Sequence, residues 1–112
     1  MYNPKKEIFD ILKELGYGVA QTQPTTFNEL PFINFEVSNN VPTYSLDNEI
    51  SYQDIDIKVD IWANTSTEAS RILSEVEYKM RQNLYKMTYC ADVPNIGDIF
   101  HTTVHFSLLI GG

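Results

Sequence analysis

The side chains of this chain that could do chemistry are two histidines, one cysteine and several acids. His101 and His105 lie four residues apart in a segment with a strand pattern, which places their Cα atoms about 13 Å from each other. A zinc ion holds its ligands at about 2 Å, so this pair alone cannot chelate one. We therefore interpret both histidines as polar residues on the outer face of a sheet and predict no metal site.

A row of acids lies on another strand-like segment. Asp54, Asp56 and Asp60 recur at even positions, and the Cα atoms of the first two are about 7 Å apart in a strand. Some glycosidases separate their two carboxylates by a similar distance. Lys58 interrupts the row, however, and nothing nearby predicts the apolar pocket that a carboxylic general acid needs. A charged face that meets solvent or another protein is the better interpretation.

Cys90 is the only cysteine, so no disulfide can form within the chain. The sequence indicates no base beside it that would activate a nucleophile, and we interpret it as a small buried hydrophobic residue. A glycine-rich phosphate loop, a G-x-S-x-G elbow and zinc-ligand spacing are also missing from the sequence. These observations predict a protein that catalyses no reaction and uses no cofactor.

Length and composition predict one globular domain over residues 1–112, with 43% hydrophobic and 21% charged residues. No apolar run is long enough to predict a membrane span, and the first residues lack the pattern of a signal peptide, which favours a cytoplasmic protein. The net charge is -7, from 15 acidic and 8 basic residues. Such a chain should not bind nucleic acid, although an acidic surface would let DNA pass without sticking.

Two segments have the apolar period of a helix. The first runs from about Asn3 to Leu15, with Asn3 at the N-cap, Pro4 in the first turn and Gly16 after its end. Its apolar face consists of Ile8, Ile11, Leu12 and Leu15. The second begins with the capping box Thr65-Ser66-Thr67-Glu68. Its predicted buried stripe consists of Ala69, Ile72, Leu73, Val76, Met80 and Leu84.

Five segments are predicted as strands, and polar stretches at Asn39–Asn48 and Asp92–Asp98 are predicted as loops. The strands are Tyr17–Gln23, Phe32–Ser38, Ile50–Trp62, Met87–Ala91 and Ile99–Ile110. The third has the clearest alternation, with an apolar row from Ile55 to Ile61. The order α-β-β-β-α-β-β predicts an α+β fold, in which two helices pack on one face of a single, mostly antiparallel sheet.

The outer face of the third strand and the loop before it form the candidate interface. Aromatic side chains among charges are typical of protein interfaces, although Trp62 tucked over a neighbouring strand or loop is an equal alternative, and the loop could be an ordinary surface loop. The candidate residues are Tyr52, Asp54, Asp56, Lys58, Asp60 and Trp62 on the strand, with Tyr44 and Asp47 from the loop.

Part of this pattern resembles a known family. Asp56-Ile57-Lys58-Val59-Asp60-Ile61-Trp62-Ala63 leads into Thr65-Ser66-Thr67-Glu68-Ala69 and then into Val76-Glu77-Tyr78-Lys79-Met80. The chain is similar to tail completion and tail terminator proteins of long-tailed bacteriophages and prophages. In those proteins a V-x-I-W/Y strand meets a T/S-x-x-E helix start, and the helix carries V-x-x-x-M. The opening I-F-D-I-L-K, the Asp92-Val93-Pro94 stretch and the last strand also fit.

The resemblance implies an α+β fold and a ring, often a hexamer, at the head-proximal end of the tail tube. The ring would stop tube growth, contact the tail tube protein and the head connector protein, and let DNA through its hole. The protein would then be part of the virion, after assembly in the host cytoplasm, and would have no catalytic residues. Two alternatives remain: another head–tail connector component, such as a stopper or adaptor, and a small cytoplasmic binding module with a ferredoxin-like sheet.

Overall fold

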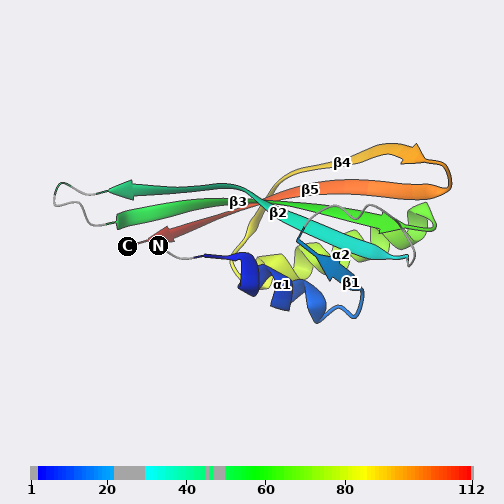
Figure 1. Cartoon of the computed structure of the whole chain (residues 1–112), viewed down its shortest axis with the longest axis horizontal. Coiled ribbons are helices and arrows are strands. Elements are labelled where there is room, and N and C mark those ends of the chain that lie inside the picture. Colours follow the sequence, from blue (N-terminus) through cyan, green and yellow to red (C-terminus); the bar gives the residue numbers. More distant parts are fainter. Residues whose placement is uncertain (1–2, 22–29, 45, 47–49, 112) are drawn as a thin grey trace.

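The elements follow one another in the predicted order. The computed structural model describes residues 3–21, 30–44, 46 and 50–111 of the chain. The fold is α+β, as predicted, and its elements are labelled in Figure 1. They are α1 (Lys5–Lys13), β1 (Gly18–Ala20), β2 (Phe32–Tyr44), β3 (Ile50–Ala63), α2 (Ser66–Gln82), β4 (Lys86–Ile96) and β5 (Ile99–Gly111).

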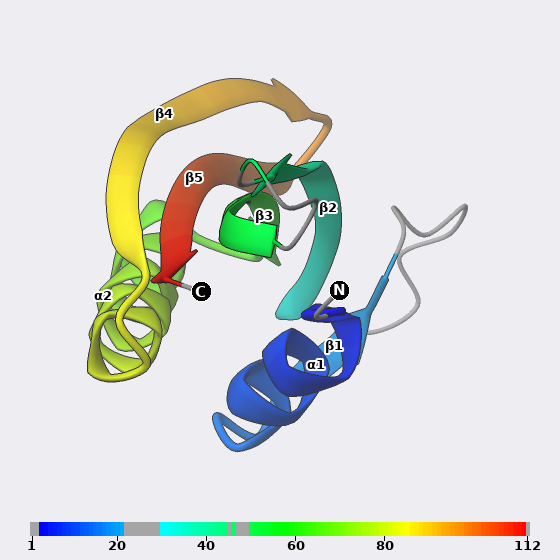
Figure 2. The ribbon, with the colours of Figure 1, turned by 90° about the vertical axis from the view of Figure 1, so that its left-hand side faces the viewer.

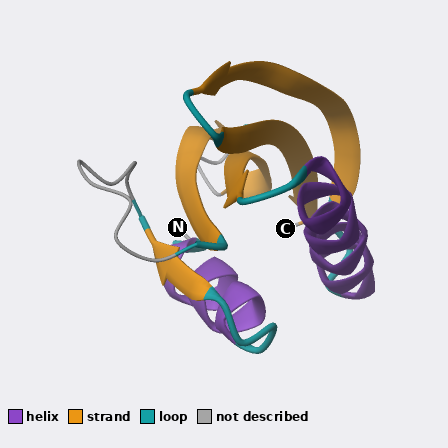
Figure 3. Ribbon diagram, turned by 90° about the vertical axis from the view of Figure 1, so that its right-hand side faces the viewer, coloured by secondary structure: helices purple, strands orange, loops and turns teal. Residues whose placement is uncertain are grey.

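The described strands form one sheet in the order β1-β2-β3-β5-β4. The short β1 pairs with β2 in parallel, and the three other pairings are antiparallel. The sheet is strongly twisted (Figure 2), and the two helices lie together on one side of it (Figure 3). The long β3 is the middle strand of the sheet, with β2 on one side and β5 on the other.

The core lies between β3 and the two helices. Ile55, Ile57, Val59 and Ile61 are fully buried, as the alternation of β3 predicts. Each such side chain stabilises the fold by roughly 1.5–3 kcal/mol relative to an exposed one. The residues that cover them are Ile8 and Leu12 of α1 and Ile72, Val76 and Met80 of α2.

Capping side chains and a glycine determine where the two helices begin and end. Thr65 Oγ1 accepts a hydrogen bond from the Glu68 N–H at 3.1 Å, and Glu68 Oε1 accepts one from the Asn64 N–H at 2.9 Å, so the capping box is confirmed. α1 begins one residue later than predicted, at Lys5, and Asn3 Oδ1 accepts from the Lys5 N–H at 3.1 Å. Gly16 follows α1 with a φ of 87°, the left-handed conformation that glycine adopts without strain.

Leu84 was predicted in the buried stripe of α2, and this is wrong. The helix ends at Gln82, and Leu84 lies beyond it with a φ of 71° and 81% of its surface exposed. Tyr85 takes the core position instead and is 2% exposed. The prediction failed because the helical period was extended to Leu84, which lies beyond the last hydrogen-bonded turn of α2.

Among their described residues, both predicted loops are largely strand, and residues 45, 47 and 48 of the first loop lie outside the described part of the chain. β2 continues from Ser38 to Tyr44, and β4 continues from Ala91 to Ile96. Asn39 and Pro42 are poor strand residues, but they pair in register with Asp56 and Gln53, and ladder pairing outweighs local preference. Pro94 is tolerated because β4 is an edge strand, where its missing N–H leaves no ladder bond unmade. β1 covers residues 18–20 of the predicted strand 17–23, of which residues 22 and 23 lie outside the described part of the chain.

Cys90 was predicted to be buried, yet its side chain is exposed on β4. The edge position explains this, because β4 has a paired neighbour only along β5. Partial burial, together with the charge of Asp92, raises the pKa of the Cys90 thiol above its ordinary value. Its thiolate is therefore less populated at neutral pH than that of a free cysteine.

Two of the four register shifts in the described sheet lie within its long strand pairings. The register shifts at Ser38 in β2 and at Thr88 in β4. The hydroxyl of each bulged residue donates to a carbonyl of the paired strand, Ser38 to Asp56 O at 3.1 Å and Thr88 to His105 O at 3.3 Å. An extra residue in one strand increases the local twist, so the bulge at Ser38 turns the end of β2 away from the helix-covered part of the sheet.

Beyond this bulge the sheet extends past the helices as a three-stranded arm, on the left in Figure 1. We define the arm as residues 39–44 of β2, 50–56 of β3 and 107–111 of β5. At its base, Ile55 still belongs to the buried core. It makes the molecule elongated, with extents of 54 × 25 × 25 Å and a radius of gyration of 15.2 Å. A compact domain of this length would have a radius of gyration of about 13 Å.

Candidate interaction surface

The candidate residues of β3 share one side of the sheet, but they differ in exposure. Tyr52 is 48% exposed, Asp54 is exposed, and Asp56 and Lys58 are half-buried, whereas Asp60 and Trp62 are 4% and 1% exposed. Of the two other candidates, Tyr44 is exposed at the end of the arm, and Asp47 lies outside the described residues. The predicted row therefore consists of two surfaces: an open one, exposed to solvent around Tyr52 and Asp54, and a closed one, buried around Asp60 and Trp62.

The closed surface is a polar cluster of four side chains from three strands: Asn34 of β2, Asp60 and Trp62 of β3, and His101 of β5. Trp62 Nε1 donates to Asn34 Oδ1 at 2.6 Å, and Asn34 Nδ2 donates to Asp60 Oδ2 at 3.1 Å. His101 Nε2 lies 2.8 Å from Asp60 Oδ1. The His101 ring also stacks on Trp62, with centroids 3.7 Å apart. Both Asp60 oxygens thus have partners, as burial of a carboxylate requires.

The pairing register assembles this cluster. Asn34 faces Asp60 across β2 and β3, and His101 faces Trp62 across β3 and β5. Asp60 and Trp62 are therefore buried in this chain and not exposed, and Trp62 adopts the tucked alternative. The alternation of residues in β3 predicts the face of the sheet on which each side chain lies. It does not predict which side chains of neighbouring strands lie next to it.

Asn34 was not singled out as a site residue, and His101 was considered only as a metal ligand, although each lies on the outer face of a strand that was predicted. The signal that could have found them is a matched set of donors and acceptors at outer positions of neighbouring strands. This signal requires the register, and the register depends on the bulges. Lys58 borders the cluster, with its Nζ 3.8 Å from both Asp60 Oδ2 and Glu36 Oε1.

The His101–Asp60 pair has the geometry of a base and the carboxylate that orients it. Within the described residues, however, the His101 ring forms no side-chain hydrogen bond apart from the one to Asp60. No three His, Cys, Asp or Glu side chains gather as metal ligands would in the described part of the chain. The contacts of the cluster tie β2, β3 and β5 together, which is a structural task.

The open surface is the outer face of the arm. Val41, Asp54 and Leu109 lie in one cross-strand row, and Tyr52 lies next to Asp54 on the same face. Val41 is 48% and Leu109 is 61% exposed. Neighbouring strands are about 4.8 Å apart, so the side chains of this row lie within about 10 Å of each other. We call Val41, Tyr52, Asp54 and Leu109 the arm patch.

Sequence reasoning identified Tyr52 and Asp54 in this patch but missed Val41 and Leu109. Val41 was assigned to a loop, and Leu109 is a large apolar residue on the outer face of β5, two positions after the polar Ser107. At the end of the arm, Tyr44 is 60% exposed and Leu46 is fully exposed. The charged residues of the described arm are Asp54 and Asp56, both acidic. The arm thus presents apolar and acidic groups together.

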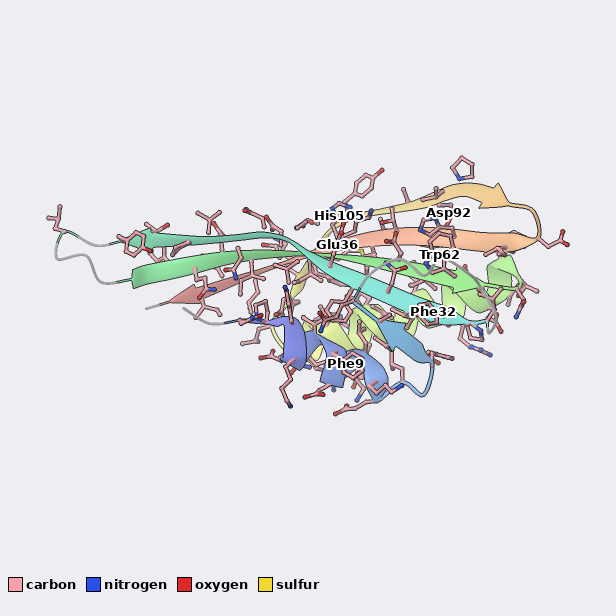
Figure 4. All side chains as sticks on the ribbon, in the orientation of Figure 1. Phe9, Phe32, Glu36, Trp62, Asp92 and His105 are labelled. Atoms are coloured by element: carbon pink, nitrogen blue, oxygen red, sulfur yellow. The ribbon has the colours of Figure 1, made fainter. Side chains whose placement is uncertain are left out.

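Figure 4 places the buried Trp62 in the half of the sheet away from the arm, and Phe9 on α1. None of the described helices is long and apolar enough to cross a membrane. In comparisons with known proteins, no family model matches the chain and no curated protein matches it significantly. The fold, the polar cluster and the arm patch are therefore the observations from which a function can be inferred.

Proposed function

We propose that this chain is a phage or prophage tail completion protein. In this proposal it caps the head-proximal end of the tail tube as a ring, with a hexamer as the expected form. It joins the tail to the head connector and acts without catalysing a reaction. The motifs that carry the resemblance lie in one continuous unit, because Val59 to Trp62 end β3, Thr65 to Glu68 start α2, and Val76 and Met80 lie on its buried side.

The observation that carries the proposal is the arm. It extends beyond the part of the sheet that the helices cover, and it holds Val41, Tyr52 and Leu109 open to solvent. Contiguous exposed apolar side chains mark surfaces that bind other proteins. A chain that acted as an isolated monomer would gain nothing from keeping such a patch exposed on a projecting structure.

The partners in this proposal are other copies of the chain, the tail tube protein and the head connector protein. DNA passes through the ring and is not bound specifically, because an acidic protein with a net charge of -7 repels the phosphate backbone. The protein would be assembled in the host cytoplasm and remain in the virion.

Deletion of the gene from the phage or prophage that encodes it tests this function. Electron microscopy of the resulting particles should show tails of abnormal length, and the wild-type gene supplied in trans should restore their length. Tails of normal length beside heads that leak DNA would instead indicate a stopper or adaptor. Normal particles with full heads would contradict a role in tail completion.

A further inference from the structure

We propose that the arm patch of one copy binds a groove beside α1 of a second copy. This inference deepens the proposed ring, because it names the two surfaces that would meet at each subunit contact.

The groove consists of two adjoining depressions. One has a volume of about 430 Å³ and is lined by Asn3, Lys5, Lys6, Phe9 and Gln21. The other has a volume of about 240 Å³ and is lined by Lys5, Gln21, Phe35, Glu36 and Val37. Lys5 and Gln21 border both, so the two are continuous. We call this surface the α1 groove.

The α1 groove combines an aromatic surface with lysines at its α1 end, whereas the acid Glu36 borders its other end. Phe9 is only partly buried against the core, and the Lys13 Nζ lies 5.9 Å from the centre of its ring. Lys5 and Lys6 are exposed. Lys6 forms an exposed ion pair with Asp10 at 2.9 Å, whereas Lys5 has no ion pair among the described residues. The Lys5 ammonium is therefore available to an acid from outside.

The arm patch has the complementary chemistry. Val41 and Leu109 flank Asp54, and the described arm contains acids but no lysine or arginine. The two apolar side chains would contact Phe9 while Asp54 meets Lys5, so that the apolar surfaces and the charges are matched in a single contact. Complementary charges of this kind select one partner surface over others.

The same charges argue against the simplest alternative, in which two arm patches meet face to face. That arrangement would bring Asp54 of one copy towards Asp54 of the other, and like charges across an interface are unfavourable. The arm patch faces away from the helices, whereas the groove is bordered by α1. A contact between two different surfaces leads from copy to copy and gives a ring when the rotation closes.

Charge reversal on each surface tests the contact, with self-association of the purified chain measured by sedimentation over a wide range of concentration. Wild type should associate as its concentration rises. Lys5→Glu and Asp54→Lys should each weaken association by about tenfold or more, and the two together in one chain should restore it to within about threefold of wild type. Lys86→Glu and Asp98→Lys are matched controls, because both residues are exposed outside these surfaces and should leave association unchanged.

Each result bears on the proposal. A wild-type chain that stays monomeric at every concentration overturns self-docking through these surfaces. The contact is also overturned if neither single charge reversal weakens self-association, or if the double variant does not regain it. In either case the proposed ring could still form through other surfaces. The particle morphology after gene deletion tests the function separately, so the two failures can be told apart. Circular dichroism of the variants should show wild-type folding, since Lys5 and Asp54 are both exposed.

Discussion

The two halves of the outer face of β3 place similar residue types in opposite environments. Asp60 and Trp62 are 4% and 1% exposed, whereas Tyr52 is 48% exposed and Asp54 is open to solvent. Around the first pair, Asn34 and His101 supply hydrogen bonds and a stacking surface. Beside the second pair, Val41 and Leu109 supply apolar surface. An acid beside an aromatic residue is thus a structural link at one end and part of an open patch at the other.

The difference shows where the molecule has completed its own contacts and where it has not. The buried polar groups of the cluster form their hydrogen bonds within the chain, with side chains from three strands. The cluster therefore needs no contact with a partner. The arm lies beyond the helices and keeps large apolar side chains in water. Substitutions at equivalent residues of the two ends should therefore change different properties, stability at the cluster and assembly at the arm.

Replacing the two aromatic residues should give the largest contrast. We expect Trp62→Ala to lower the free energy of unfolding by about 3–5 kcal/mol, since it removes a fully buried ring and leaves a cavity. Tyr52→Ala, the matched control on the open half, should cost less than about 1 kcal/mol. Chemical denaturation followed by circular dichroism measures both values. Equal losses at the two positions would show that burial does not distinguish the two ends.

The two aspartates should give a smaller contrast. Asp60→Ala leaves Asn34 and His101 without their buried acceptor, and we expect a loss of about 2–3 kcal/mol. Asp54→Ala should change stability by no more than about 0.5 kcal/mol. Because Asn34 and Asp60 share a hydrogen bond, the double variant Asn34→Ala/Asp60→Ala should lose less than the sum of the single losses. Strict additivity in the same denaturation experiment would contradict a shared network.

The sequence predicts features that depend on the apolar period of one segment or on the capping of one helix. It fails for features that depend on pairing with another strand. The row from Ile55 to Ile61 and the capping box at Thr65 need only neighbouring residues, and both are confirmed. The end of β2 was missed because Asn39 and Pro42 are typical of turns, and only their pairing with β3 holds them in a strand. The sequence left a tucked Trp62 as one of two equal alternatives, because choosing between them requires the register that brings His101 beside it.

Tyr85 extends the comparison to a buried polar group whose surroundings differ from those of Asp60. It is 2% exposed, and within the described residues its hydroxyl has no hydrogen-bond partner. Burial first, and then the charge of Glu7, raises the pKa of Tyr85 well above its ordinary value of 10.0. The folded chain therefore favours the neutral phenol, and the stability linked to this shift is fully present below pH 10 and is lost as the pH rises above it.

These properties predict that Tyr85→Phe will not destabilise the protein at pH 7 and will raise its free energy of unfolding by up to about 1 kcal/mol, because it removes a buried hydroxyl that lacks a partner. Between pH 10 and 12 the variant should also lose less stability than wild type, since phenylalanine cannot ionise when the chain unfolds. Urea denaturation at pH 7 and pH 11 measures both effects, with the exposed Tyr44→Phe as the control for loss of a hydroxyl. A loss above about 1 kcal/mol at pH 7 would show that the Tyr85 hydroxyl does contribute a stabilising bond. Such a loss would place Tyr85 with Asp60 among the buried polar groups that hold the fold together.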